Sequence, residues 1–230
     1  MFDLWWGLKL DTSMSFLATE LKQRCLILLF IGITSIPAFP QAADSPIKFI
    51  APGAVTATFV DAPSLGGSNN SSGSSRDSKW LKIEFRYSVT PTKGDYVDSV
   101  EFKVWVEGRD LANTNAPGDE GAAVALTGSV TYVNIPTSKE AYGVFYVHPS
   151  TLTRYGGKGG SSDFERKFDV HVAALVGGSI VDNVDKNKEK DPAWFQPLIP
   201  IAGFVCRQDQ SPFLLADLNR YPAIKLPATQ

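Results

Sequence analysis

Apolar and polar residues alternate along two neighbouring segments of this chain, 80–89 and 97–107. In the first, the apolar side chains are Leu81, Ile83, Phe85, Tyr87 and Val89. In the second, they are Val100, Phe102, Val104 and Val106. A period of two is typical of β-strands that turn one face to a core and the other to water. We therefore predict two long strands, which the turn at 91–95 joins as a hairpin.

The same pattern predicts further short strands between turns rich in glycine and proline. They are expected at 54–60, 128–135, 141–148, 166–175 and 179–183, with Gly177 and Gly178 as the turn before the last. Seven to nine short strands without a long helical segment indicate an all-β fold, and we predict an immunoglobulin-like β-sandwich. A jelly roll is the alternative all-β arrangement, because strand spacing alone does not separate the two.

The segment from Pro192 to the last residue lacks a regular period. It contains six prolines and several large apolar residues, among them Trp194, Phe195 and Phe204. These side chains need a surface to cover, so we expect the segment to wrap around the sandwich. Within it, 199–207 is expected to pair as an edge strand. Ser211 is expected to begin a short helix over 211–219.

The N-terminal part has the features of a secretory signal. A basic stretch, 22–24, precedes an apolar run, 25–36, and prolines and the small pair Ala42 and Ala43 follow. We assign 1–43 to a signal peptide, with Met14 a more ordinary start than Met1, and 44–230 to one domain with its C-terminal extension. The run is shorter than the about 20 residues of a membrane-spanning helix. The mature chain is therefore expected without a membrane span, in the periplasm, at the outer membrane or on the cell surface.

Composition argues against several classes of function. The formal net charge of −2 gives no electrostatic case for binding nucleic acid. The two cysteines are Cys25 and Cys206, and Cys25 lies in the predicted signal, so no internal disulfide is expected in the mature chain.

Residues that could support catalysis or metal binding are sparse. The two histidines, His148 and His171, fall on predicted strands without a second ligand nearby, and no nucleophile elbow occurs. The acidic segment 182–191 lacks the glycine and the closing glutamate of a calcium loop, and the serine-rich segment 65–78 has the composition of a flexible loop. We expect no enzyme, no cofactor and no metal. A hydrolase with carboxylates on separate loops is the weaker alternative, since such a pair leaves no spacing signature.

Five aromatic residues are the candidate contacts for a ligand or a partner: Trp80, Trp105, Tyr142, Tyr146 and Tyr155. The two tryptophans lie on the polar side of their strands, and the tyrosines lie near a glycine-rich loop. Such side chains suit a surface that stacks on sugars or binds protein. The alternative is that the C-terminal segment covers them.

The stretches WLKIEFRYSV and VDSVEFKVWVEG, in an exported chain of this size without disulfides, resemble the immunoglobulin-like envelope proteins encoded beside type IV pilus-like genes in mucus-dwelling verrucomicrobial bacteria. The resemblance covers about 47–225 and transfers no catalytic residue. It implies a non-enzymatic role in pilus formation or surface adhesion. The apolar run lacks the glutamate and the cleavage signature of a type IV pilin, so the resemblance favours an accessory role over that of the fibre-forming subunit.

The leading hypothesis is an exported protein that acts through contacts with envelope or pilus-related proteins and offers edge strands for β-augmentation. The alternative is a carbohydrate-binding module for host glycans. Burial of Trp80 and Trp105 separates the two, since a stacking platform needs an exposed ring face.

Overall fold

The computed structural model of the chain describes residues 45–63, 79–91, 93–113, 121–157, 168–187 and 193–226. The chain divides into two compact units, Met1–Pro40 and Gln41–Gln230, and all described residues belong to the second. The assigned signal peptide and the serine-rich segment 65–78 lie outside the described residues.

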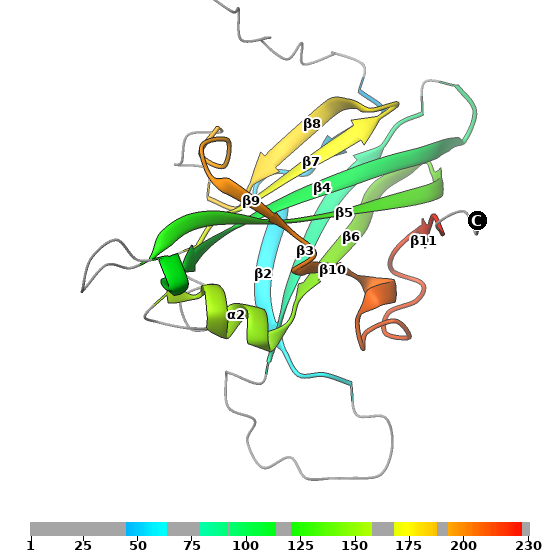
Figure 1. Cartoon of the computed structure of the whole chain (residues 1–230). Coiled ribbons are helices and arrows are strands. Elements are labelled where there is room, and N and C mark those ends of the chain that lie inside the picture. The colour runs from blue at the N-terminus through cyan, green and yellow to red at the C-terminus, as the bar shows by residue number, and fades with distance from the viewer. Residues whose placement is uncertain are drawn as a thin grey trace, which may run out of the picture. The chain divides into compact units, whose positions relative to one another are not determined.

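One sheet, sheet A, contains five antiparallel strands (Figure 1). They are β1 (Ile47–Phe49), β2 (Val55–Val60), β3 (Trp80–Val89), β6 (Ser138–Val147) and β10 (Val205–Arg207). β1 and β2 pair with the same side of β3, one after the other, and β6 pairs with its other side. β3 has the bounds predicted from the alternating pattern.

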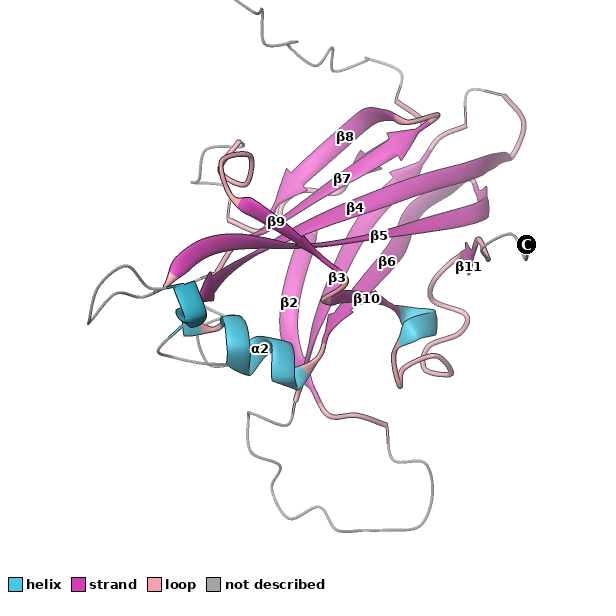
Figure 2. Cartoon of the chain, in the orientation of Figure 1, coloured by secondary structure: helices cyan, strands magenta, loops and turns pink. Residues whose placement is uncertain are grey.

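The second sheet, sheet B, contains six strands (Figure 2). They are β4 (Tyr96–Asp110), β5 (Ala122–Pro136), β7 (Val170–Val176), β8 (Ser179–Asp185), β9 (Ile199–Ala202) and β11 (Ala223–Ile224). The order β11-β5-β4-β7-β8 is antiparallel, and β9 pairs with β5 in parallel. Gly177 and Gly178 have positive φ and form the β7–β8 turn as predicted, because a tight hairpin turn needs this backbone conformation.

The two sheets are interlocked through their strand connections. β3 pairs with β6 in sheet A, while their successors β4 and β7 pair in sheet B. The predicted all-β sandwich is therefore confirmed, with eleven strands in the described part rather than seven to nine. The hairpin predicted at 91–95 is wrong, because β3 and β4 belong to different sheets. Each of these long strands has its own apolar face, and the two faces meet across the core instead of lying side by side.

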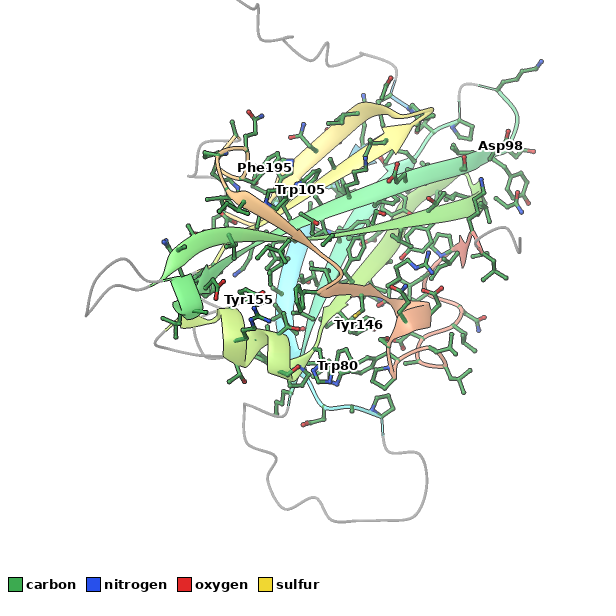
Figure 3. The ribbon with its side chains drawn as sticks, viewed as in Figure 1. Trp80, Asp98, Trp105, Tyr146, Tyr155 and Phe195 are labelled. Carbon is green, nitrogen blue, oxygen red and sulfur yellow. The ribbon has the colours of Figure 1, made fainter. Side chains whose placement is uncertain are left out.

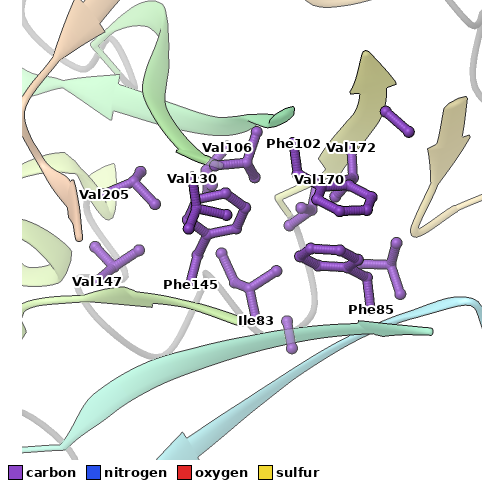
Figure 4. Packing of buried hydrophobic residues seen from close by; sticks show 14 of the residues in the cluster. Ile83, Phe85, Phe102, Val106, Val130, Phe145, Val147, Val170, Val172 and Val205 are labelled. Atoms are coloured by element: carbon purple, nitrogen blue, oxygen red, sulfur yellow. The ribbon is translucent and has the colours of Figure 1, made fainter. Parts of the chain in front are cut away.

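The core lies between the sheets and consists of the inward side chains of both (Figure 4). Phe85 of sheet A and Phe102 of sheet B are fully buried, with ring centroids 4.7 Å apart. Gly143 on β6 leaves room for this pair, since a Cβ at that position would overlap the Phe85 ring. Aromatic rings that meet across the sandwich add to the stabilisation that their buried area provides.

One short helix, α2 (Pro149–Tyr155), connects β6 to the segment before β7. The expected strand 141–148 ends one residue early because His148 caps the helix: its Nδ1 accepts a hydrogen bond from the Ser150 N–H at 3.1 Å. Leu152 and Tyr155 pack into the core from this helix. The sequence pattern did not predict it, since seven residues are too few to show a helical period.

The last described residues, 193–226, form a strap that joins the two sheets. β9 pairs with β5 of sheet B, β10 pairs with β6 of sheet A, and β11 returns to β5. The strap passes Gly128 of β5 closely, since a Cβ there would lie 2.7 Å from the carbonyl oxygen of Val205. The predicted wrap and the predicted edge strand at 199–207 are thus confirmed, the latter as two short strands.

Candidate functional site

The strap covers the outer face of sheet A chiefly with the ring of Phe213. Phe213 stacks on Tyr146 of β6 with ring centroids 4.4 Å apart and an interplanar angle of 4°. It also meets the edge of Trp80 at 5.9 Å. Together with Val144 and Tyr221, these rings form a second hydrophobic cluster outside the main core. Phe213 is therefore the anchor that fixes this part of the strap.

Charged groups fasten the strap a few residues further on. The Glu84 carboxylate of β3 accepts hydrogen bonds from the Arg220 guanidinium at 2.8 and 3.1 Å and from the Tyr221 hydroxyl at 2.6 Å. Lys82 Nζ lies 2.9 Å from the same carboxylate. Burial acts to raise the pKa of Glu84, but the bonds from Arg220, Tyr221 and Lys82 outweigh it and lower the pKa to about 2. Glu84 is thus ionised wherever the protein is folded near neutral pH.

Residues 211–220, which carry the anchors Phe213 and Arg220, form a series of turns. The amide Nε2 of Gln208 donates to the carbonyl oxygens of Phe213 and Ala216, at 3.2 and 2.5 Å. The helix predicted over 211–219 is therefore wrong, although the Ser211 hydroxyl accepts a bond from the Phe213 N–H as an N-cap would. The Gln208 side chain donates hydrogen bonds to carbonyl groups that would accept backbone N–H groups within a helix. Asp217 has a positive φ of 52°, which interrupts the helical conformation.

This anchored loop presents three leucines to solvent: Leu214, Leu215 and Leu218 are 49%, 73% and 62% exposed. We call them the leucine patch. The loop that carries them is held by a stacked ring at one side and by an ion pair at the other. Three large apolar side chains exposed within five residues of a fixed loop make this loop the candidate interaction surface of the described residues.

The strap covers the outer face of sheet B in a similar way (Figure 3). Phe195 packs on Trp105 and on His171, with centroid distances of 4.7 and 4.2 Å. The carboxylate oxygen Oδ1 of Asp185 bonds both the Trp194 indole N–H and His171 Nδ1, each at 2.9 Å. His171 is therefore a buried strand histidine in a structural contact, as expected from its position on a strand.

A shallow groove of about 590 Å³ lies between the strap and the outer face of sheet B. Its polar and aromatic lining comprises Lys103, Trp105, Thr127, Ser129, Arg207 and Gln210. Both cations have acidic partners, since Lys103 lies 3.7 Å from Glu101 and Arg207 lies 2.8 Å from Asp209. The groove thus has no excess of positive charge that would select an anionic ligand.

The five aromatic residues singled out from the sequence lie in three places. Tyr146 and Tyr155 are only 1% and 2% exposed, and Tyr155 packs in the main core beside Phe204. Trp80 and Tyr142 are half-buried on sheet A beneath the strap, and the Arg220 guanidinium lies 4.0 Å above the Tyr142 ring. Trp105 is half-buried on sheet B. The structure therefore brings Trp80, Tyr142 and Tyr146 together in the second hydrophobic cluster and leaves Tyr155 and Trp105 apart from them.

The leucine patch was missed from the sequence. The sequence predicted only that the C-terminal segment wraps around the sandwich, and it singled out none of these leucines as exposed. The signal that could have found them is the run Phe213–Leu214–Leu215 in a segment with polar residues on both sides. A turn can bury only some of three consecutive apolar side chains against a single face.

The described residues contain no cluster of side chains suited to hold a metal ion. Within the same part of the chain, no helix has the length and apolar character needed to cross a bilayer.

Comparison with known proteins agrees with the fold. No curated protein matches the chain. A solved structure of a protein from Akkermansia muciniphila, a verrucomicrobial gut bacterium, superposes with a TM-score of 0.61. The two sequences are 21% identical, and the match covers 79% of this chain and 93% of the Akkermansia chain. A family model matches residues 44–228, which is most of the sequence. The chain therefore belongs to the family that this model defines.

Proposed function

We propose that this protein is an exported, non-enzymatic component of the bacterial envelope that acts through protein–protein contacts, in an accessory role to a type IV pilus-like system or to surface adhesion. The leucine patch is the observation that carries the proposal. Leu214, Leu215 and Leu218 supply apolar area that gains stability only when a partner covers it. The likeness to a protein of a verrucomicrobial bacterium supports the fold that the resemblance implied.

The anchors of the patch strengthen the proposal. A partner that binds a flexible loop must order it, and this ordering reduces the affinity. Here Phe213 and the Arg220–Glu84 ion pair already fix the loop on sheet A. The leucines are therefore presented in one arrangement before any partner arrives.

The alternative function, a carbohydrate-binding module, finds less support. A sugar-stacking platform needs a free tryptophan ring face, whereas Trp105 packs on Phe195 and Trp80 lies against His148 and Phe213. The contacts with Phe195 and Phe213 are the wrap that the sequence offered as the competing explanation of the aromatic residues.

Photo-crosslinking in cells that produce the protein tests the proposal. A photoreactive amino acid replaces Leu215, and, as a control, the exposed Lys139 on β6. We expect the probe at Leu215 to capture pilin-like or secretion-machinery proteins, and the probe at Lys139 to capture few. Replacing Leu214 and Leu218 by serine should reduce capture at position 215 without lowering the melting temperature. Equal capture at both positions, or no protein partner together with retention on mucin, would contradict the proposal.

A further inference from the structure

The sandwich has a pocket of about 470 Å³ at the end where β4 begins. Its walls are β4, the β7–β8 turn and the segments before β1 and after β3, and its lining includes Pro46, Pro91, Lys93, Tyr96, Asp98 and Ser99. We call it the β4 pocket. None of its lining residues belongs to the strap. Figure 3 shows Asp98 at the end of the sandwich opposite to Tyr155.

The edge of β4 beside this pocket has backbone groups without a partner in the described part of the chain. On this side of β4, the Glu107 N–H donates to the Asp169 carbonyl at 3.0 Å, and alternate residues as far as Glu101 pair with β7 in the same way. Ser99 is the next such residue. It would face Gly177, which lies in the β7–β8 turn, and no backbone hydrogen bond joins the two. The N–H and C=O of Ser99 therefore point to the pocket unpaired.

An irregularity in β4 puts a carboxylate next to this edge. The β4–β5 pairing skips Asp98 and Asn134, although the pairs on both sides of them are formed, and Asn134 has a positive φ of 53°. As a result, two exposed residues, Asp98 and Ser99, lie between the buried Val97 and Val100. A regular strand would alternate here and turn only one of the two to solvent. Asp98 therefore lines the pocket beside the open backbone groups.

The side chains at the pocket comprise an exposed ring and unpaired charges. The Tyr96 ring is 59% exposed and contacts no other ring or cation of the described residues. Asp95, Asp98 and Lys93 are exposed, and none of them forms an ion pair with another described residue. Two carboxylates and one ammonium group leave a net charge of −1 at the pocket. By charge complementarity, the pocket favours a ligand that carries a positive group.

We propose that the β4 pocket binds an extended peptide segment of a partner protein, which adds a short strand to the Ser99 edge of β4 and directs a basic side chain to Asp98. A peptide backbone supplies both the C=O and the N–H that the two open groups of Ser99 need. Strand addition to an exposed edge, with side-chain pockets that give specificity, is a recurring mode of peptide recognition. Here Pro46, Pro91 and Tyr96 supply apolar surface for a further side chain.

The peptide reaches this edge without displacing a strand. Val176 and Gly177 line the pocket together with Ser99, so its space lies between the edge and the β7–β8 turn. The turn consists of Gly177 and Gly178, and a Cβ at either position would meet no atom within 4 Å. No side chain of the turn therefore fills the space beside Ser99. The leucine patch contributes nothing to the pocket, so peptide binding here does not depend on the proposed function.

Peptides selected from a phage-displayed random library on the full-length chain are the probes for this site. Fluorescence anisotropy measures their affinity for the unmodified chain and its variants. We expect the selected peptides to contain Lys or Arg. Ser99→Pro removes the N–H at the open edge and should weaken binding roughly tenfold or more. Ser99→Ala keeps this N–H, so it is the matched control and should bind as the unmodified chain does.

Asp98→Asn tests the part played by charge. It should weaken binding about fivefold, the upper range for an exposed ion pair, and the difference should shrink at high salt. Asp217→Asn removes an exposed carboxylate of the strap and should leave the affinity unchanged. Equal losses for the two variants would show that the peptides respond to the net charge of the protein, which contradicts the proposal.

N-methylation of the peptide keeps the test decisive if Ser99→Pro fails to fold. A single N-methyl group removes one N–H of the peptide and leaves the protein untouched. We expect binding to be lost at the position whose N–H donates to the Ser99 carbonyl. A library that yields no binding peptide, or peptides that tolerate both Ser99→Pro and N-methylation at every position, overturns the proposal.

Discussion

Single residues in this protein act through partners that lie far away in the sequence. Glu84 and Arg220 are 136 positions apart, yet their ion pair fastens the strap to sheet A. The alternation of 80–89 predicted that Glu84 would face away from the core, and it does. No local pattern could show what would cover it, because the partner belongs to a segment without a regular period.

The Glu84 ion pair makes the stability of the strap depend on pH. The pKa of Glu84 is lowered from 4.5 to about 2 in the folded protein. Because the pKa of this carboxyl is lower in the folded than in the unfolded protein, its ionisation stabilises the fold at any pH above the unfolded-state pKa of about 4.5. This stabilisation is lost as the pH falls from about 4.5 to about 2. We expect Glu84→Gln to lower the melting temperature at neutral pH, and the difference from the unmodified protein to shrink towards pH 2. A difference that is constant across this range would contradict the assignment.

Gly143 provides a second test at the scale of one residue. Its Cβ position is occupied by the Phe85 ring, so Gly143→Ala forces ring and strand apart. Overpacking of this kind costs about 1–3 kcal/mol of the free energy of unfolding. Chemical denaturation measures the loss. The double variant Gly143→Ala with Phe85→Leu should lose less than the sum of the two single variants, because the smaller side chain makes room. Additive losses would exclude this contact as the cause.

The elements could be predicted from the sequence where one face is buried and the other is solvated. β3 followed the alternating pattern over its whole length, because nothing but the core selects its inward residues. β7 was harder to delimit: six of its seven residues are buried, since the strap covers its outer face as well. The missed helix α2, which is too short to show a helical period, and the wrong helix at 211–219 share one further feature. In both segments a side chain, His148 or Gln208, determines the backbone conformation through a hydrogen bond.

The strap depends on Phe213 more than on the leucines that follow it. Phe213 is 6% exposed and stacks on Tyr146, whereas Leu214 is 49% exposed. Removing a buried aromatic ring costs about 3–5 kcal/mol, so we expect Phe213→Ala to destabilise the protein by up to this amount and to release Trp80 to solvent. Denaturant unfolding and tryptophan fluorescence measure the two effects. Leu214→Ala is the matched control and should change the free energy of unfolding by less than about 0.5 kcal/mol. Similar losses for both variants would show that the leucines also anchor the strap.

At the scale of the molecule, the sequence was sufficient to predict the architecture but not to predict which apolar side chains lie on the surface. Seven or more alternating segments demand two apolar faces that cover each other, and this requirement leads to a sandwich. The candidate site did not follow from the same reasoning. Tyr146 and Tyr155 lie under other elements, and the exposed leucines lie in a segment that was expected to wrap around the sandwich. Which apolar residue a turn leaves outside depends on three-dimensional anchors such as Phe213 and Gln208.

The place of the strap in the chain determines the order in which the protein is completed during synthesis. Domains fold as the chain emerges, N-terminal parts first, and all strands of the sandwich except β9, β10 and β11 precede the strap. Until the strap emerges, the β5 and β6 edges lack their partners, and Trp80 and Trp105 lack the phenylalanine rings that pack on them. A nascent chain halted before residue 193 would therefore expose the apolar surface and the unpaired strand edges that chaperones bind. The strap would cover both once it is synthesised.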